Sequence, residues 1–435
     1  MQKEQLTMTQ ELEKLRKPMA RMFYICFAVI FSYEFLTSSM MFTPFQNLIL
    51  RGLVWLPLNL IEPVFKMILN LRHIIIIPAI FTIIYEVKDK NRKIILILLL
   101  LVGWFYAIYW REVEDYAVFT PLLVVVACAD RDIKKIIKIS LICGSMILGL
   151  AFVLSRVGVI EDLVWQRPGV NMPDRHAFGM QYCTDSVSHV MFLILMYMFL
   201  KRGRLKWYAY VVIIILSVIN VIYVDGMISL FCVVMGLLGC LYVVAYDKKK
   251  WRIPSVVLKG WKGLVLASFW IGAIILFVWV LVYKKDPDIW YNRYYSLQNR
   301  LNTNYRLLTQ IPFSWFGTGF VQVGLGGKEE MPEYYFWVDC SYPRVYAMYG
   351  IVAFLIFMGL LTWIVIRLMK KKDYFGMYLM AIIAVDCMIE HHMIEIAYNT
   401  FMVLAFANLD SVLGKTSSKN MGIAKDVSES VRASL

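Results

Sequence analysis

The chain alternates between long apolar runs and short polar connections. A helix of roughly twenty apolar residues crosses a bilayer, and on that criterion the apolar runs predict about twelve transmembrane helices. The sequence therefore predicts an all-α polytopic membrane protein. The predicted spans lie near residues 20–39, 62–86, 93–110, 116–129, 138–157, 184–200, 207–224, 227–246, 262–283, 346–368, 374–389 and 393–411.

Two stretches fit this pattern less well. Residues 44–61 are apolar but contain Arg51 and two prolines, so we expect a half-buried segment outside the membrane. The span at 116–129 is short for a bilayer, so we expect it to be tilted or broken.

Composition agrees with a membrane protein. Of 435 residues, 60% are hydrophobic and only 17% are charged, whereas soluble domains are nearer half apolar and a quarter charged. The net charge of +14 does not indicate nucleic-acid binding, because most basic residues form short runs between apolar segments. With about twelve spans these runs all fall on one side, and the positive-inside rule then places both termini in the cytoplasm.

The topology predicts a single transmembrane domain over residues 1–411 and a disordered cytoplasmic tail over residues 412–435. Two large loops, residues 161–184 and 284–345, then lie on the outer face of the membrane. The second loop contains a predicted helix from Ile289 to Ile311, followed by Pro312 and the turn Gly317-Thr318-Gly319.

Arginines are concentrated in these outer loops, where basic residues are normally scarce. One interpretation is that they contact lipid headgroups or pair with nearby acidic residues. The other, which we favour, is that they bind a diphosphate, because the planar guanidinium fork matches phosphate oxygens. The residues concerned are Arg167, Arg175, Arg293, Arg300, Arg306 and Arg344, with His176 beside Arg175.

Asp339 precedes the span at 346–368. It either pairs with Arg344 or acts as a general base on a sugar hydroxyl. Further along, Glu390, His391, His392 and Glu395 lie close together in the sequence. We expect no metal site there, because adjacent histidines on a helix point to different faces and the H-E-x-x-H spacing is missing. Glu390 and His392 are alternative candidates for the base.

Several short motifs resemble those of the Wzy/O-antigen-ligase superfamily of polysaccharide polymerases and ligases. The family pattern places an arginine before a P-x-x-G-x-G element, an acidic or histidine motif and a glycine. Cys340 stands where that family usually has Asn. The matching residues are Arg300, Pro312, Phe316-Gly317-Thr318-Gly319-Phe320, Asp339-Cys340-Ser341-Tyr342 and Tyr349-Gly350, together with Arg175-His176-Ala177-Phe178-Gly179 in the earlier loop.

The resemblance implies a GT-C-like inverting glycosyltransferase in the bacterial plasma membrane, with no cofactor and no metal. Its donor would be a glycan on undecaprenyl diphosphate, and its acceptor a lipid-linked repeat unit. Expected partners besides membrane lipid are a chain-length regulator and a flippase. The implied catalytic residues are Arg175, Arg300 and Asp339, and the implied substrate-binding residues are Arg167, His176, Arg293, Arg306, Tyr342 and Arg344.

Two other functions stay open. A glycan ligase of the same superfamily would transfer finished polymer to a different acceptor by the same chemistry. A lipid-linked oligosaccharide flippase would need a charged aqueous path through the spans. The predicted spans are almost bare of charge in their middle, which favours the enzyme.

Overall fold

A computed structural model describes residues 2–52, 60, 70–110, 116–166, 174–249, 254–285, 295–318, 320, 322–325, 328 and 333–413. Within these ranges, seven helices are long and apolar enough to cross a membrane. The protein is therefore an all-α, multi-pass membrane protein. The seven are α1 (Gln2–Thr37), α5 (Lys90–Tyr109), α7 (Ile133–Arg156), α8 (Cys183–Lys201), α10 (Met227–Lys249), α11 (Ser255–Lys285) and α14 (Ser341–Lys370).

Three shorter apolar segments accompany the long helices. They are α9 (Trp207–Tyr223), α15 (Tyr374–Asp386) and a continuous run of η1 (Leu71–Ile75), α4 (Ile76–Phe81) and η2 (Thr82–Glu86). The remaining elements are α2 (Phe42–Gly52), α6 (Phe119–Ala127), α13 (Tyr295–Gln310), η4 (Thr400–Ala405), α16 (Asp410–Leu413) and the paired strands β1 (Val164–Trp165) and β2 (Arg175–His176).

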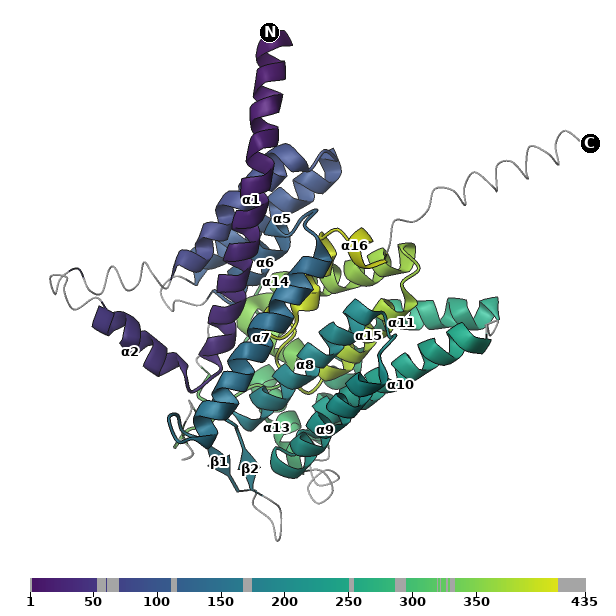
Figure 1. Ribbon diagram of the computed structural model, residues 1–435. Helices are drawn as coiled ribbons and strands as arrows, with labels where there is room; N and C mark the ends of the chain where they lie inside the picture. The colour runs from purple at the N-terminus through teal and green to yellow at the C-terminus, as the bar shows by residue number, and fades with distance from the viewer. Residues whose placement is uncertain are drawn as a thin grey trace, which may run out of the picture.

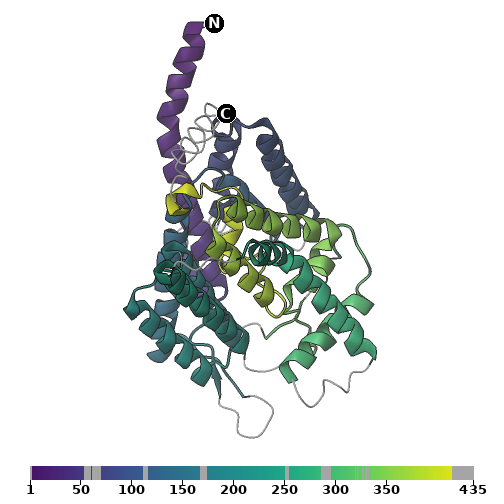
Figure 2. The same cartoon turned by 90° about the vertical axis from the view of Figure 1, so that its right-hand side faces the viewer.

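The helices differ in how much of their surface the protein itself covers. Along α8, α14 and α15 most side chains are buried, so these helices form the centre of the bundle. On α5, α9 and α11 large aliphatic side chains stay exposed, for example Leu101, Ile214 and Leu281. In a membrane protein these faces are the ones that lipid covers. Strands β1 and β2 and helix α13 lie at the end of the molecule opposite to the N-terminus (Figures 1 and 2).

One predicted span is wrong. Residues 393–411 do not form a transmembrane helix but a turn-rich segment that contains the short 3₁₀ helix η4. Almost all of this segment is buried among other helices. Its apolar composition therefore reflects burial in protein, and a hydropathy pattern does not distinguish that from burial in lipid.

Other predicted boundaries are partly reproduced. The short span at 116–129 contains α6, a helix of only nine residues that are all buried, which agrees with a broken span. Residues 44–61 begin in α2, which ends at Gly52, and residues 53–59 and 61 lie outside the described ranges. The tail from residue 414 onward also lies outside them.

Two glycines of the family-like motifs meet at a break in α14. Gly350 has φ 82° inside this helix, and a Cβ atom there would lie 2.4 Å from the backbone N of Gly317. Gly317 also has a positive φ, and its own Cβ would overlap the carbonyl of Met348. Only glycine fits both positions. The break lets the backbone amides of Ile351 and Val352 donate to the carbonyls of Ser314 and Trp315, which fixes the loop after α13 against α14.

Candidate functional site

A cavity of about 690 Å³ lies at the end of the bundle that carries β1, β2 and α13. It is lined by α1, by the start of α8, by α14 and by the turn-rich segment after α15. Residues 322–325, Trp337 and Asp339 from the loop before α14 also line it. Its charged lining residues are Glu34, Asp185, Asp339, Arg344 and Glu395, and its aromatic lining residues are Tyr182, Trp337, His391 and Tyr398.

Arg300 joins three segments beside this cavity. Its Nη2 donates to Oε1 of Glu390 at 3.0 Å, and its Nε donates to the carbonyl oxygen of Ile389 at 3.0 Å. The same Nε lies 3.4 Å from Oδ2 of Asp339. Asp339 lines the cavity and its side chain is 32% exposed, whereas Arg300 and Glu390 are largely covered. Asp339 therefore pairs with Arg300.

The position of Asp339 follows from how α14 begins. Ser341 is the first residue of that helix, and its hydroxyl donates to the carbonyl of Glu390 at 2.6 Å and accepts from the amide of Met393 at 3.2 Å. These two bonds fix the turn-rich segment against the start of α14. As a result, Asp339 and Glu390, which are far apart in the sequence, reach the same guanidinium group.

Burial and neighbouring charges shift the pKa values of Arg300 and Glu390 in opposite directions. Burial lowers the pKa of Arg300, but Asp339 and Glu390 outweigh it and raise that pKa, so the guanidinium stays protonated. Burial also raises the pKa of Glu390, while Arg300 and, more weakly, Arg175 oppose the rise.

Arg344 forms an ion pair with Glu395. Its Nη2 lies 3.8 Å from Oε1 of Glu395, and its guanidinium carbon lies 5.2 Å from the ring centre of Trp337. Its Nη1 is buried and has no hydrogen-bond partner among the described residues. A cavity-lining guanidinium with an unused donor is suited to an anionic ligand.

Arg175 and His176 of the earlier loop each have a polar contact within the described residues. Arg175 belongs to β2, and its Nε donates to the carbonyl of Val224 at 2.8 Å, between α9 and α10. His176 is next to it, and its Nδ1 lies 2.7 Å from Oδ2 of Asp162. His176 belongs to the β1–β2 pair, and it does not line the cavity.

Two further predicted residues also have other contacts. Arg306 on α13 packs over Tyr334 and Phe336 and donates to the Tyr334 hydroxyl at 3.4 Å. Tyr342 is completely buried, and its hydroxyl donates to the carbonyl of Ala384 at 2.8 Å. Neither lines the cavity. Arg167 and Arg293 lie outside the described residues.

The interpretation of the two adjacent histidines was based on a wrong premise. Residues 390–399 are not helical, so the argument that neighbouring side chains point to different helix faces does not apply. The rings of His391 and His392 are instead 4.1 Å apart. His392 stacks on Tyr398 at 3.6 Å, and Tyr398 stacks on His189 at 3.8 Å.

Sequence reasoning missed Asp185 as a site residue. It lies in the first turn of α8, where we predicted an apolar span, and it hydrogen-bonds with Tyr398. An ionisable residue at the end of an apolar span is itself a signal, because such residues usually face a wet interior. The same signal applies to Glu34 near the end of α1, which also lines the cavity.

The site therefore combines carboxylates, guanidinium groups and aromatic surfaces around one cavity in a membrane protein. This set of groups is able to bind an anion, to accept a proton and to pack against the face of a sugar. Comparisons with protein-family models, with curated proteins and with solved structures found no match to the chain.

Proposed function

We propose that this protein is a Wzy-type glycosyltransferase that polymerises undecaprenyl-diphosphate-linked repeat units into a surface polysaccharide. The observation that carries the proposal is the triad of Arg300, Asp339 and Glu390 beside a cavity within a frame of membrane-spanning helices. In the proposed topology the chain crosses the membrane about twelve times in a GT-C-like arrangement, and one crossing is made by the turn-rich residues 393–411, which form no transmembrane helix and are buried in protein. Both termini are cytoplasmic and the cavity faces outward from the bacterial plasma membrane.

In the proposed reaction, a hydroxyl of the acceptor sugar attacks the anomeric carbon of the donor. A new glycosidic C–O bond forms while the bond from that carbon to the diphosphate oxygen breaks, with inversion. The diphosphate leaves with the bonding electron pair, and Asp339 accepts the proton of the hydroxyl. Asp339 suits this role because it is the exposed member of its pair with Arg300.

The guanidinium groups stabilise the leaving diphosphate. Arg344 has an unused donor at the cavity wall, and fixed donors aimed at developing charge lower the barrier without reorganisation. Arg300 holds Asp339 and Glu390 in place and keeps a positive charge beside the reacting groups. Tyr182 and Trp337 supply aromatic surfaces for sugar rings.

A glycan ligase has the same chemistry and differs in its acceptor. The accumulated intermediate separates the two functions: cells that lack a polymerase retain single lipid-linked repeats, whereas cells that lack a ligase retain long lipid-linked polymer. A flippase would leave the repeats on the cytoplasmic side. We favour a glycosyltransferase over a flippase because the charged groups surround a cavity at one end of the bundle.

The proposal is tested by Arg300→Ala and Arg300→Lys in the organism that carries the gene, with Arg306→Ala as the matched control on the same helix. We expect Arg300→Ala to abolish polymer while the protein remains in the membrane at its normal level, as measured by immunoblotting. Arg300→Lys keeps the charge but loses the fork, so we expect shorter or less polymer. Arg306→Ala should leave chain length unchanged. Normal polymer in both Arg300 variants would refute the proposal.

A further inference from the structure

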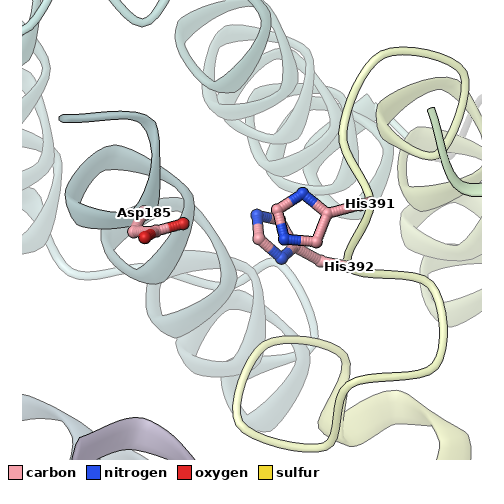
Figure 3. A group of neighbouring side chains, drawn as sticks. All are labelled: Asp185, His391 and His392. Carbon is pink, nitrogen blue, oxygen red and sulfur yellow. The ribbon is translucent and has the colours of Figure 1, made fainter. Parts of the chain in front are cut away.

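Three potential metal ligands converge on one side of the cavity. The carboxylate of Asp185 and one nitrogen each from His391 and His392 all lie within 4.8 Å of one another. Asp185 comes from α8, and both histidines come from the turn-rich segment after α15. Figure 3 shows the Asp185 carboxylate facing the two imidazole rings.

Each of the two imidazoles has one nitrogen near Glu395 and one nitrogen without a partner among the described residues. Nδ1 of His392 lies 3.1 Å from Oε2 of Glu395, and its Nε2 is buried without a hydrogen-bond partner among the described residues. Nε2 of His391 lies 3.7 Å from Oε1 of the same carboxylate, and its Nδ1 is likewise unpartnered. His392 is only 1% exposed.

Burying an imidazole nitrogen without a partner costs free energy, and two such nitrogens side by side need a common explanation. Metal-binding histidines typically use one ring nitrogen for the metal and the other for a carboxylate. Glu395 is placed to supply that carboxylate to both rings, and Tyr398 hydrogen-bonds with Asp185. The surrounding contacts thus match those that orient metal ligands.

The charge of the cavity also favours a cation. Among the described lining residues, Glu34, Asp185, Asp339 and Glu395 are acidic, and Arg344 is the one lining arginine. A bound divalent cation would offset part of this negative charge and would let an anionic group approach.

We propose that the protein binds a divalent transition-metal ion of the Zn²⁺ class through Asp185, His391 and His392, with Glu395 orienting both imidazoles. Imidazole nitrogens suit zinc and its neighbours, whereas Mg²⁺ and Ca²⁺ prefer sites made of oxygen. Three protein ligands leave a fourth position open toward the cavity, as in zinc sites that bind water or substrate. The inference does not depend on the proposed glycosyl transfer.

The test uses the full-length protein in detergent, after removal of any histidine tag and treatment with EDTA. Zn²⁺ binding is measured by calorimetry, and the bound metal is quantified by elemental analysis after dialysis. We expect about one Zn²⁺ per chain and no comparable binding of Mg²⁺. Glu395→Gln should weaken Zn²⁺ binding by about 10–100-fold, and loss of a ligand in Asp185→Asn or His392→Ala should weaken it by more.

His176→Ala is the control, because this histidine pairs with Asp162 away from the cavity. Asp185→Asn keeps the shape of the side chain and therefore covers the case in which His392→Ala, which loses its stack on Tyr398, fails to fold. No Zn²⁺ binding by the wild-type protein would overturn the inference. Equal affinity in the wild type and Asp185→Asn would do the same.

Discussion

Arginines gather in two parts of this molecule, and they are held in different ways. At the basic end, defined here by Arg16, Glu86, Arg92, Arg131 and Arg367, guanidinium groups join neighbouring elements. Arg131 pairs with Glu86 at 2.8 Å and donates to Thr82 at 2.6 Å. Arg367 donates to the carbonyls of Leu404 and Ala407, so it caps backbone groups at the end of η4.

The cavity cluster, defined by Asp185, Arg300, Asp339, Arg344, Glu390, His391, His392 and Glu395, is built differently. Its members also pair with one another, and Arg344, His391 and His392 each keep a buried polar atom without a partner among the described residues, as Nε of Arg131 does at the basic end. The cluster borders a cavity of about 690 Å³. Unused hydrogen-bonding capacity beside an open space is a cost to stability that a ligand removes. The comparison therefore assigns a structural role to the basic end and a binding role to the cavity cluster.

The largest effect on polymer formation is expected for Asp339→Asn in the cavity cluster. The side chain is partly exposed and the amide still accepts from Arg300, so the unfolding temperature should change little. Loss of the general base should reduce polymer formation by about 10²–10⁴-fold. Polymer synthesis in membranes and thermal unfolding in detergent measure the two effects separately. Normal synthesis with Asn would move the base to Glu390 or His392.

For Arg131→Ala at the basic end, we expect a loss of stability. This change removes the buried cation from Glu86 and leaves it the Thr82 hydroxyl at 3.0 Å and the exposed Arg16 at 3.4 Å. Breaking a buried ion pair on one side costs about 3–5 kcal/mol in the free energy of unfolding, and denaturant unfolding in detergent measures it. The double variant Arg131→Met/Glu86→Leu should recover most of that loss. A stable Arg131→Ala protein that makes no polymer would break the comparison.

Much of this arrangement is predictable from the sequence. The apolar runs and the scarcity of charge identify a polytopic membrane protein, and the short motifs single out Arg300 and Asp339, which are in contact in the structure. Gly317 and Gly350 come from two separate motifs and meet at one point of close backbone contact. Both have positive φ there, and neither position has room for a Cβ atom. Local residue type therefore predicts local geometry well.

Contacts between distant segments are less predictable. Residues 393–411 look like a span because burial in protein and burial in lipid need the same apolar residues. Asp185 was missed because it lies within an apolar run, and its neighbours His391 and His392 are more than two hundred residues away. The histidine pair lies in a segment that the sequence suggests is helical and that is not helical in the structure. Each error concerns how the turn-rich segment packs, and packing depends on residues that are far apart in the chain.

The smallest effect that we expect to separate the cavity cluster from the basic end is that of Arg344→Lys on the affinity for pyrophosphate. Lysine keeps the charge but not the planar fork, and a charge-assisted hydrogen bond is worth about 1.5–3 kcal/mol. Loss of one such bond should weaken binding of inorganic pyrophosphate by roughly 10–100-fold. Calorimetry in buffer that contains EDTA measures this without any contribution from bound metal.

Lys371→Ala is the control for Arg344→Lys. Lys371 pairs with Asp410 at 2.6 Å, and both side chains are about a third exposed or more, so the pair should contribute at most about 1 kcal/mol to stability. It lies at the far end of α14 from Arg344, and its replacement should leave pyrophosphate affinity unchanged. If Lys371→Ala, which removes a charge, reduces that affinity and Arg344→Lys does not, pyrophosphate responds to the overall charge and not to the cavity. In that case the unused donor of Arg344 would no longer distinguish the cavity cluster from the basic end.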